Sequence, residues 1–299
     1  MKNSEAQLSK SLYIPKKAPG RIWEIDLLRG LFFLGVFLFH LGWDIAMLPS
    51  VFSNFYFQAS PSLRRFVSEI GHILYLPSMT WLVRIFSGGF LLLTGICCSL
   101  SKDNLLRGLK ILSWGELLTV ITVIICLVGQ TEELIVFGIL HCIGFTIALF
   151  GLYQRLEREL SFRTPAWLYI ALGILVWLVG YYFIYGLKAE SASAGNLVSF
   201  ADIDPKNILA IVVGTKCSYG DSFPLFPNAG KVLVGIGLGK LCYGERRGKV
   251  SLFPKLDGWW FAPLKFIGRH SLILYLGEQA VAWVVIVLVM IPLGYTLGF

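Results

Sequence analysis

Charged residues are scarce in this sequence, and the cysteine patterns typical of metal sites or disulfide frameworks are missing. Asp, Glu, Lys and Arg make up 15% of the 299 residues, whereas hydrophobic residues make up 56%. The six cysteines contain no Cys-x-x-Cys pair, and only Cys217 lies in a predicted loop, while the others lie in or beside apolar segments. We therefore expect neither a metal site nor structural disulfides.

A clustered basic patch and a cleavable leader are also missing. The formal net charge is +8, but the Lys and Arg residues are dispersed over loops and the ends of apolar segments, which argues against a nucleic-acid partner. The first apolar segment follows a polar stretch and lacks a small-residue cleavage motif, so we expect it to be retained.

Long apolar runs dominate the sequence. The mean hydropathy of +0.71 and the length of these runs predict an all-α, polytopic transmembrane helix bundle that lies in a lipid bilayer. We predict about seven spans, with an eighth as the alternative if residues 49–79 cross the membrane instead of forming an interfacial connection. The seven predicted spans cover residues 27–48, 80–100, 109–129, 134–153, 165–187, 223–243 and 266–296.

The distribution of basic residues predicts the orientation of the bundle. Lys and Arg cluster in residues 1–25 and in the loops after the second, fourth and sixth spans, whereas the turn after the third span has none. Cytoplasmic loops carry this excess of positive charge. We therefore predict a basic cytoplasmic tail over residues 1–25, a membrane domain over 26–299, and an outer C-terminus.

The first predicted span and the residue before it carry four ionisable residues on one helix face. At 100° per helical residue, the side chains fall within about 60° of one another, along about 27 Å of helix. Ionisable groups inside a membrane are costly, and a functional site is the default explanation for them. These residues are Asp26, Arg29, His40 and Asp44.

Two histidines are predicted at the same depth near the outer side. His40 lies in an outward-running span and His141 in an inward-running one, while Asp44 lies one turn above His40 and Asp221 lies at the outer mouth of the sixth span. An imidazole with a carboxylate partner is a competent general base. Interhelical hydrogen bonding without catalysis is the alternative for either histidine.

Basic residues near the cytoplasmic ends of four spans form a second candidate site, for a phosphorylated ligand. Snorkelling to the membrane surface is the alternative explanation for each. These residues are Arg29, Lys110, Lys240 and Arg269. Glu116 and Glu278 are predicted to be buried carboxylates near mid-membrane, which accept a proton or bond to a neighbour.

Several motifs, in order, resemble the membrane domain of heparan-alpha-glucosaminide N-acetyltransferase and its prokaryotic relatives. They begin with Ile25-Asp-Leu-Leu-Arg-Gly before His40, and continue with Phe90-Leu-Leu-Leu-Thr-Gly, Arg107-Gly-Leu-Lys, Phe137-Gly-Ile-Leu-His-Cys-Ile-Gly, Phe223-Pro-Leu-Phe-Pro and Ile267-Gly-Arg-His-Ser-Leu-Ile-Leu-Tyr. The similarity spans about residues 21–285. The spacing of Arg29 and His40 also resembles a signature of the broader membrane acyltransferase superfamily.

The resemblance implies transfer of an acetyl or other short acyl group from acetyl-CoA or another acyl-CoA; as the cysteine pattern indicates, we expect no metal. The acceptor would be a hydroxyl or amine of a glycan or lipid-linked molecule, and the location a prokaryotic plasma membrane; a homo-oligomer is left open. Arg29 and His40 match functional positions. We expect His40 to act as base, Asp44 to orient it, and His141 or a backbone donor to stabilise the oxyanion, by direct transfer or through an acyl-histidine.

Two other classes of function fit a polar stripe in a membrane bundle. A transporter or flippase would line a path with it, but the sequence shows no internal repeat with paired, interrupted spans. A receptor-like module would bind a ligand without catalysis. We expect an acyltransferase.

Overall fold

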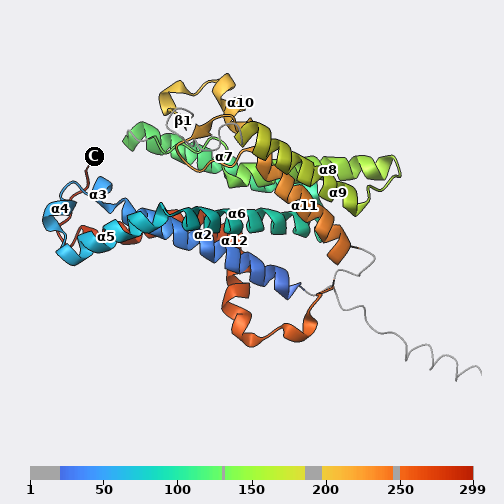
Figure 1. The fold of residues 1–299 in the computed structure, drawn as a ribbon, viewed down its shortest axis with the longest axis horizontal. Coiled ribbons are helices and arrows are strands. Elements are labelled where there is room, and N and C mark those ends of the chain that lie inside the picture. The colour runs from blue at the N-terminus through green and yellow to red at the C-terminus, as the bar shows by residue number, and fades with distance from the viewer. Residues whose placement is uncertain (1–20, 130–131, 186–196, 245–249, 299) are drawn as a thin grey trace, which may run out of the picture.

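The computed structural model describes residues 21–129, 132–185, 197–244 and 250–298. Most of the predicted basic tail, residues 1–20, lies outside this part of the chain. The described residues are almost entirely helical, with two strands of two residues each. The prediction of an all-α polytopic bundle is therefore confirmed (Figure 1).

In the part of the chain that the structure describes, seven long helices run along the bundle. They are α2 (Trp23–Ala46), α6 (Pro77–Ile96), α7 (Asn104–Gly129), α8 (Ile139–Glu159), α9 (Ala166–Val179), α11 (Leu225–Tyr243) and α12 (Ala262–Met290). A 3-10 turn, Cys97–Ser99, extends α6, and a π-helical turn, Gly180–Tyr185, extends α9. Among the described residues, 5 helices are long and apolar enough to cross a membrane, and α9 with its π turn is a shorter apolar helix. The count of seven spans stays a prediction.

Successive long helices run in opposite directions, so that the first and the last of them, α2 and α12, run parallel to each other. Tyr243 at the end of α11 hydrogen-bonds to Glu24 at the start of α2, and Arg269 near the start of α12 contacts Asp26. We call this side of the bundle the Trp23 end and the opposite side the Ala46 end, after the two termini of α2. The loops of residues 100–103 and 160–165 lie at the Trp23 end (Figure 1).

Glycines allow the closest helix pairs to meet backbone to backbone. A Cβ atom on Gly30 would overlap the carbonyl oxygen of Leu264, and one on Gly268 would overlap that of Asp26, so α2 and α12 cross where neither has a side chain. Gly95 of α6 meets Val232 of α11 in the same way. Small residues at such crossings are typical of membrane helix packing, which depends on van der Waals contact.

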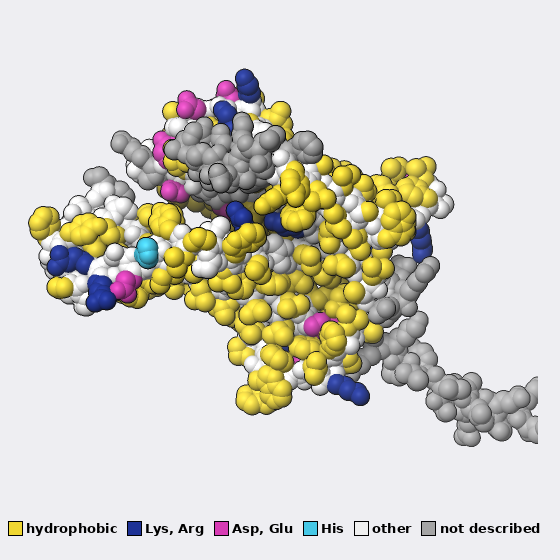
Figure 2. All heavy atoms as spheres, in the orientation of Figure 1, with side chains coloured by type: hydrophobic (Ala, Val, Ile, Leu, Met, Phe, Trp, Pro, Cys, Tyr) yellow, Lys and Arg dark blue, Asp and Glu magenta, His cyan; other side chains and the backbone are white. Residues whose placement is uncertain are grey.

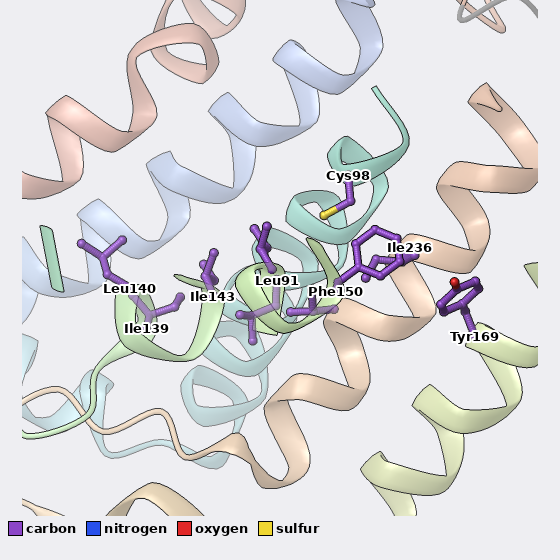
Figure 3. Packing of buried hydrophobic residues seen from close by; sticks show 10 residues of the cluster. Leu91, Cys98, Ile139, Leu140, Ile143, Phe150, Tyr169 and Ile236 are labelled. Atoms are coloured by element: carbon purple, nitrogen blue, oxygen red, sulfur yellow. The ribbon is translucent and has the colours of Figure 1, made fainter. Parts of the chain in front are cut away.

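The main hydrophobic core lies where α6, α8 and α11 converge. Leu91, Ile147, Val232 and Ile236 have no exposed side-chain surface, and Figure 3 shows Leu91, Ile143 and Phe150 pointing into the same space. The outer surface is hydrophobic over the middle of the bundle, whereas acidic and basic side chains gather mostly toward its edges (Figure 2). This arrangement is the one expected of a bundle surrounded by lipid.

Smaller elements cover the Ala46 end. The residues between the first two predicted spans form α3 (Leu48–Val51), α4 (Phe55–Gln58) and α5 (Pro61–Leu74), and they pack on the C-terminal segment through Phe52, Phe55 and Tyr295. Ser60 caps α5 by accepting from the Leu63 amide, and Pro61 occupies its first turn. At about 1.5 Å per residue, α5 is about 21 Å long, shorter than a bilayer core.

The long connection before α11 folds into a small unit at the same end. β1 (Leu197–Val198) pairs in parallel with β2 (Cys217–Ser218), and α10 (Pro205–Val213) lies between them in sequence. Gly214 ends α10 in a left-handed conformation with a φ of 107°.

The predicted boundaries need correction at both ends of the bundle. The first helix begins at Trp23, within the predicted tail, because Ile22, Trp23 and Ile25 are buried against other segments. The last long helix ends at Met290 instead of residue 296, since Tyr295 folds back onto Phe52 and Phe55. Boundary errors of a few residues are expected where packing, not periodicity, ends a helix.

Candidate functional site

A cavity of about 570 Å³ opens near the Trp23 end between α2, α6, α7, α8 and α12. Four arginines line it, namely Arg21, Arg29, Arg107 and Arg269. Its remaining wall is mostly apolar and includes Phe33, Val36, Phe90, Ile139, Leu140, Ile143 and Leu272. We call it the arginine cavity. Its composition suits a long ligand with an anionic end and an apolar or neutral body.

Asp26 neutralises one of the four arginines. Arg269 donates from Nε to Asp26 Oδ2 at 3.1 Å, while Arg29 Nη2 lies 2.7 Å from the Cys97 sulfur and has no carboxylate partner among the described residues. The cavity mouth therefore carries an excess of positive charge. A planar guanidinium group can bind two phosphate oxygens at once through parallel hydrogen bonds, so the mouth of the cavity is suited to binding phosphate.

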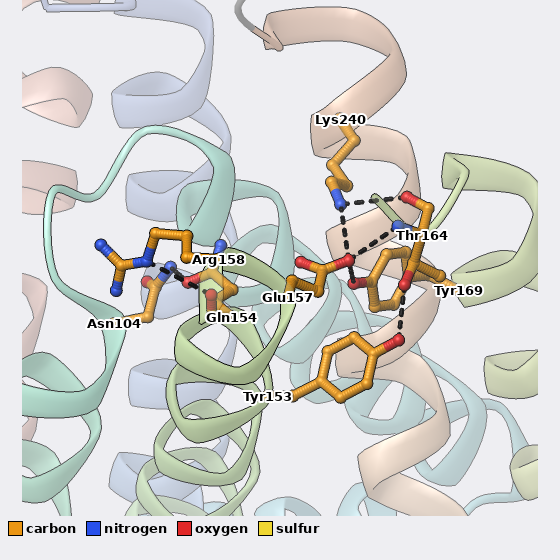
Figure 4. Close-up of polar contacts among 8 residues, drawn as sticks. All are labelled: Asn104, Tyr153, Gln154, Glu157, Arg158, Thr164, Tyr169 and Lys240. Atoms are coloured by element: carbon orange, nitrogen blue, oxygen red, sulfur yellow. Dashed lines mark hydrogen bonds and ion pairs between the residues drawn. The ribbon is translucent and has the colours of Figure 1, made fainter. Parts of the chain in front are cut away.

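Two of the four basic residues predicted for this site lie elsewhere. Lys110 is exposed and does not line the cavity, because it is two residues from Gly108, which faces α8, and so points about 200° away. Lys240 turns toward the loop before α9, where it donates to the Thr164 carbonyl at 3.2 Å and lies 4.0 Å from Glu157 (Figure 4). It also lies over the Tyr169 ring.

Arg21 and Arg107 line the arginine cavity, whereas Lys110 and Lys240, which were predicted to bind the ligand there, do not. Arg107 appears in the motif before Gly108, so its neighbouring glycine was the available signal that this turn of α7 faces another helix. Arg21 precedes α2 and was assigned only to the tail. No pattern in the sequence distinguishes it from the other basic residues of that segment.

The His40 ring is paired with a carboxylate from α12. Nδ1 of His40 lies 2.6 Å from Oε1 of Glu278, and the Glu278 side chain is 4% exposed. The other oxygen, Oε2, is buried without a hydrogen-bond partner among the described residues. Glu278 is therefore buried, as predicted, and it makes the contact that was expected of Asp44.

Asp44 faces inward but bonds to a different group. Its side chain is buried, and the Gln279 amide, turned so that its nitrogen donates, lies 3.1 and 3.2 Å from the two carboxylate oxygens. Asp44 is close enough to His40 to add to the negative field around the ring. The stripe predicted on the first span does turn inward, with Asp26 and Asp44 both buried.

Asp221 links the loop before α11 to two helices. Its Oδ2 accepts from the Ile139 backbone N–H at 3.1 Å and from the Tyr275 hydroxyl at 3.2 Å. Both His40 and His141 lie within its electrostatic reach. Tyr275 also lines the arginine cavity and lies one helical turn before Glu278, so it connects the two predicted levels of the site.

His141 is held on the other side of Asp221, in the first turn of α8. Its Nδ1 accepts from the Gly138 backbone N–H and its Nε2 lies beside the Thr119 hydroxyl, both at 3.2 Å. Gly115 leaves the room in which the ring packs. We call His40, His141, Asp221, Tyr275 and Glu278 the polar cluster.

The prediction that Glu116 is buried is wrong. Its side chain is 64% exposed and its Oε1 lies 3.7 Å from Nε2 of His141. Its neighbour Gly115 faces the bundle, and the next residue on a helix turns about 100° away, which explains the exposure.

The cysteines and acidic residues form no metal centre in the described part of the chain. No group of three or more His, Cys, Asp or Glu residues there is placed to hold an ion, and the six cysteines, all in that part of the chain, form no disulfide. The chemistry available at the polar cluster is proton transfer by imidazole and carboxylate groups, next to a cavity with a positive mouth.

A polytopic membrane bundle with a basic cavity and an imidazole–carboxylate pair beyond it is an arrangement suited to a membrane-embedded transferase. The comparison with known families agrees: residues 21–280 match the family described as heparan-alpha-glucosaminide N-acetyltransferase, catalytic. The chain belongs to this family and is an acetyltransferase-like, integral multi-pass membrane enzyme. No curated protein and no solved structure matches the chain.

Proposed function

We propose that the protein transfers an acetyl or other short acyl group from acyl-CoA to a hydroxyl or amine of a glycan or lipid-linked acceptor. The acyl-CoA would bind in the arginine cavity from the cytoplasm, and the acceptor would lie on the other side of the membrane. The observation that supports this most is Tyr275. It lines the inner part of the arginine cavity and also bonds to Asp221 of the polar cluster, so a thioester in the cavity would end beside the proposed acid–base groups.

The donor fits the cavity by its chemistry. Coenzyme A ends in phosphate groups, which Arg21, Arg29, Arg107 and Arg269 would bind at the cavity mouth. Its long neutral arm would run along the apolar wall toward Ile139 and Leu140 at the start of α8. The positive charge at the mouth would also speed the capture of an anionic donor from solution.

The polar cluster supplies a base and a place for the developing charge. Because Glu278 holds Nδ1 of His40, Nε2 is left to take the proton of the acceptor as its oxygen or nitrogen attacks the thioester carbonyl. The carbon–sulfur bond then breaks, and the imidazolium returns the proton to the CoA thiolate. His141 and the backbone N–H groups at the start of α8 are candidates for stabilising the oxyanion.

The test is acyl transfer by the purified full-length protein with labelled acetyl-CoA and an extract of membrane lipids and glycans. Removing a general base costs about 10²- to 10⁴-fold, so His40→Ala should lower the rate by that factor without abolishing donor binding. His72→Ala, at an exposed site on α5, is the matched control and should leave the rate unchanged. Equal rates for His40→Ala and the wild type would refute the role of His40.

A further inference from the structure

Two cations in the half of the bundle nearer the Ala46 end have no role in the steps above. Arg84 lies on α6 seven residues after its start, and Lys231 lies on α11 six residues after its start. At about 1.5 Å per residue, the Cα of Arg84 lies about 10 Å below the start of α6, and Lys231, whose side chain crosses Gly88, lies about one turn further in. The preference for cytoplasmic basic residues does not explain this position.

The two side chains share one surface. Lys231 crosses Gly88 of α6, where a Cβ would lie 3.9 Å from Nζ, and Arg84 is about one turn before Gly88 on the same helix face. Arg84 is exposed, and its charge lies close enough to act on Lys231. Two like charges brought together in a membrane repel each other unless an anion lies between them.

Neither cation is neutralised by the protein in the part of the chain that is described. Lys231 donates to the Asn228 side-chain oxygen at 2.9 Å, and the guanidinium of Arg84 stacks on the Trp81 ring at 5.3 Å, but neither forms an ion pair with a carboxylate. Unpaired charge at this depth is expensive, so a bound anion would stabilise it.

The residues around Arg84 and Lys231 hold these two side chains in place. Asn228 itself donates to the Pro224 carbonyl at 3.0 Å, which orients its oxygen toward Lys231. Trp81, 60% exposed and one turn from the start of α6, lies where membrane-interface aromatics are found. Cys142, the residue after His141, contacts the same Pro224 carbonyl through its Sγ at 3.9 Å, so Lys231 borders the polar cluster.

We propose that Arg84 and Lys231 bind the phosphate group of a membrane lipid and present that lipid to the polar cluster as the acyl acceptor. The guanidinium and ammonium groups would hold the phosphate oxygens, while the lipid chains would lie along the apolar surface of α6 and α11. The acceptor role rests on the proposed acyl transfer, whereas the phosphate site itself does not.

Lipid binding by the full-length protein in phosphate-free maltoside micelles tests the site. Native mass spectrometry would compare retention of phosphatidic acid with that of diacylglycerol, which has the same chains and no phosphate. We expect retention of the phosphate lipid only, weakened at least about tenfold in the Arg84→Gln, Lys231→Gln double variant, the loss expected for one or two charge-assisted hydrogen bonds.

Matched variants control for folding and for general charge effects. Arg64→Gln removes an exposed cation at the same end of the bundle and should leave lipid binding unchanged. The exchange Arg84→Lys, Lys231→Arg keeps both charges and should restore binding. Equal binding by the double glutamine variant and the wild type would overturn the site, and competition by millimolar inorganic phosphate would reassign it to a soluble anion.

The acceptor role has a separate readout. His40→Ala should retain the lipid and lose acyl transfer, whereas the double glutamine variant should lose both lipid retention and transfer of labelled acetyl into the lipid fraction. If the lipid is retained but the wild type labels no phosphate lipid, the acceptor assignment is overturned. Failure of the proposed acyl transfer itself would instead appear as the absence of label in every fraction.

Discussion

At the scale of single residues, the pairing of His40 with Glu278 is the contact on which the proposed chemistry depends. The two side chains come from different helices and lie 238 positions apart in the sequence, with Nδ1 and Oε1 2.6 Å apart. A buried carboxylate that bonds to one ring nitrogen fixes which nitrogen faces the substrate. Glu278 therefore orients His40, and Asp44 adds negative charge from further away.

This assignment predicts unequal effects for two isosteric substitutions. Glu278→Gln removes the charge that stabilises the imidazolium, so kcat should fall at least about tenfold, within the range that positioned acid–base groups contribute. Asp44→Asn should cost less, because Asp44 is hydrogen-bonded to Gln279 and not to the ring. Steady-state kinetics with acetyl-CoA measures both. If Asp44→Asn lowered kcat more than Glu278→Gln, Asp44 and not Glu278 would be the residue that orients His40.

Asp103, in the loop before α7, contributes stability that depends on pH. The Leu106 backbone N–H, which donates to Oδ1 at 3.1 Å, holds the pKa of Asp103 below its usual value, and nearby Arg155 adds to the effect. A lowered pKa in the folded protein means that the stabilisation is complete above the unfolded value of about 4 and is lost as the pH falls through the lower, folded pKa.

Asp103→Ala should therefore lower the melting temperature at pH 7, and the difference from the wild type should shrink as the pH falls below about 4. Thermal unfolding followed by tryptophan fluorescence at several pH values would measure this. A difference independent of pH over that range would show that the carboxylate charge is not involved.

At the scale of elements, the crossing of α2 and α12 places the two ends of the site. Gly30 and Gly268 allow the backbones to touch near the Trp23 end, next to Asp26 and Arg269, and the helices then continue in parallel to His40 and Glu278. Helical periodicity predicted that the stripe from Asp26 to Asp44 faces inward. It could not predict which residue of α12 meets it, since that depends on where the glycines cross.

The crossing can be tested with a pair of alanine substitutions on one helix. Gly268→Ala places a methyl group against the Asp26 carbonyl and should destabilise the protein by about 1–3 kcal/mol, the usual cost of overpacking. Gly277→Ala is the matched control, because nothing lies within 4 Å of a Cβ at that position. Melting temperatures in detergent should fall for the first variant only; equal shifts would argue against close contact of α2 and α12.

At the scale of the whole molecule, sequence patterns predicted the class of fold and the order of helices better than the members of the site. Long apolar runs separated by basic loops are enough to predict a helical membrane bundle, because the backbone N–H and C=O groups inside a bilayer must form hydrogen bonds with one another. The roles of Arg107 and Tyr275, and the exposure of Glu116, depend on the rotation of each helix about its axis. That rotation is fixed by packing at residues such as Gly108 and Gly115, which the sequence alone does not pair.

In the proposed mechanism, the donor enters at the Trp23 end and the acyl group leaves near the Ala46 end. Acetyl-CoA does not cross membranes, so labelled acetyl-CoA added to sealed membrane vesicles of known orientation tests this most directly. We predict label transfer only when the donor is on the cytoplasmic side, and its loss with His40→Ala. Equal transfer with the donor on the opposite side, or full transfer by His40→Ala, would contradict the proposed mechanism.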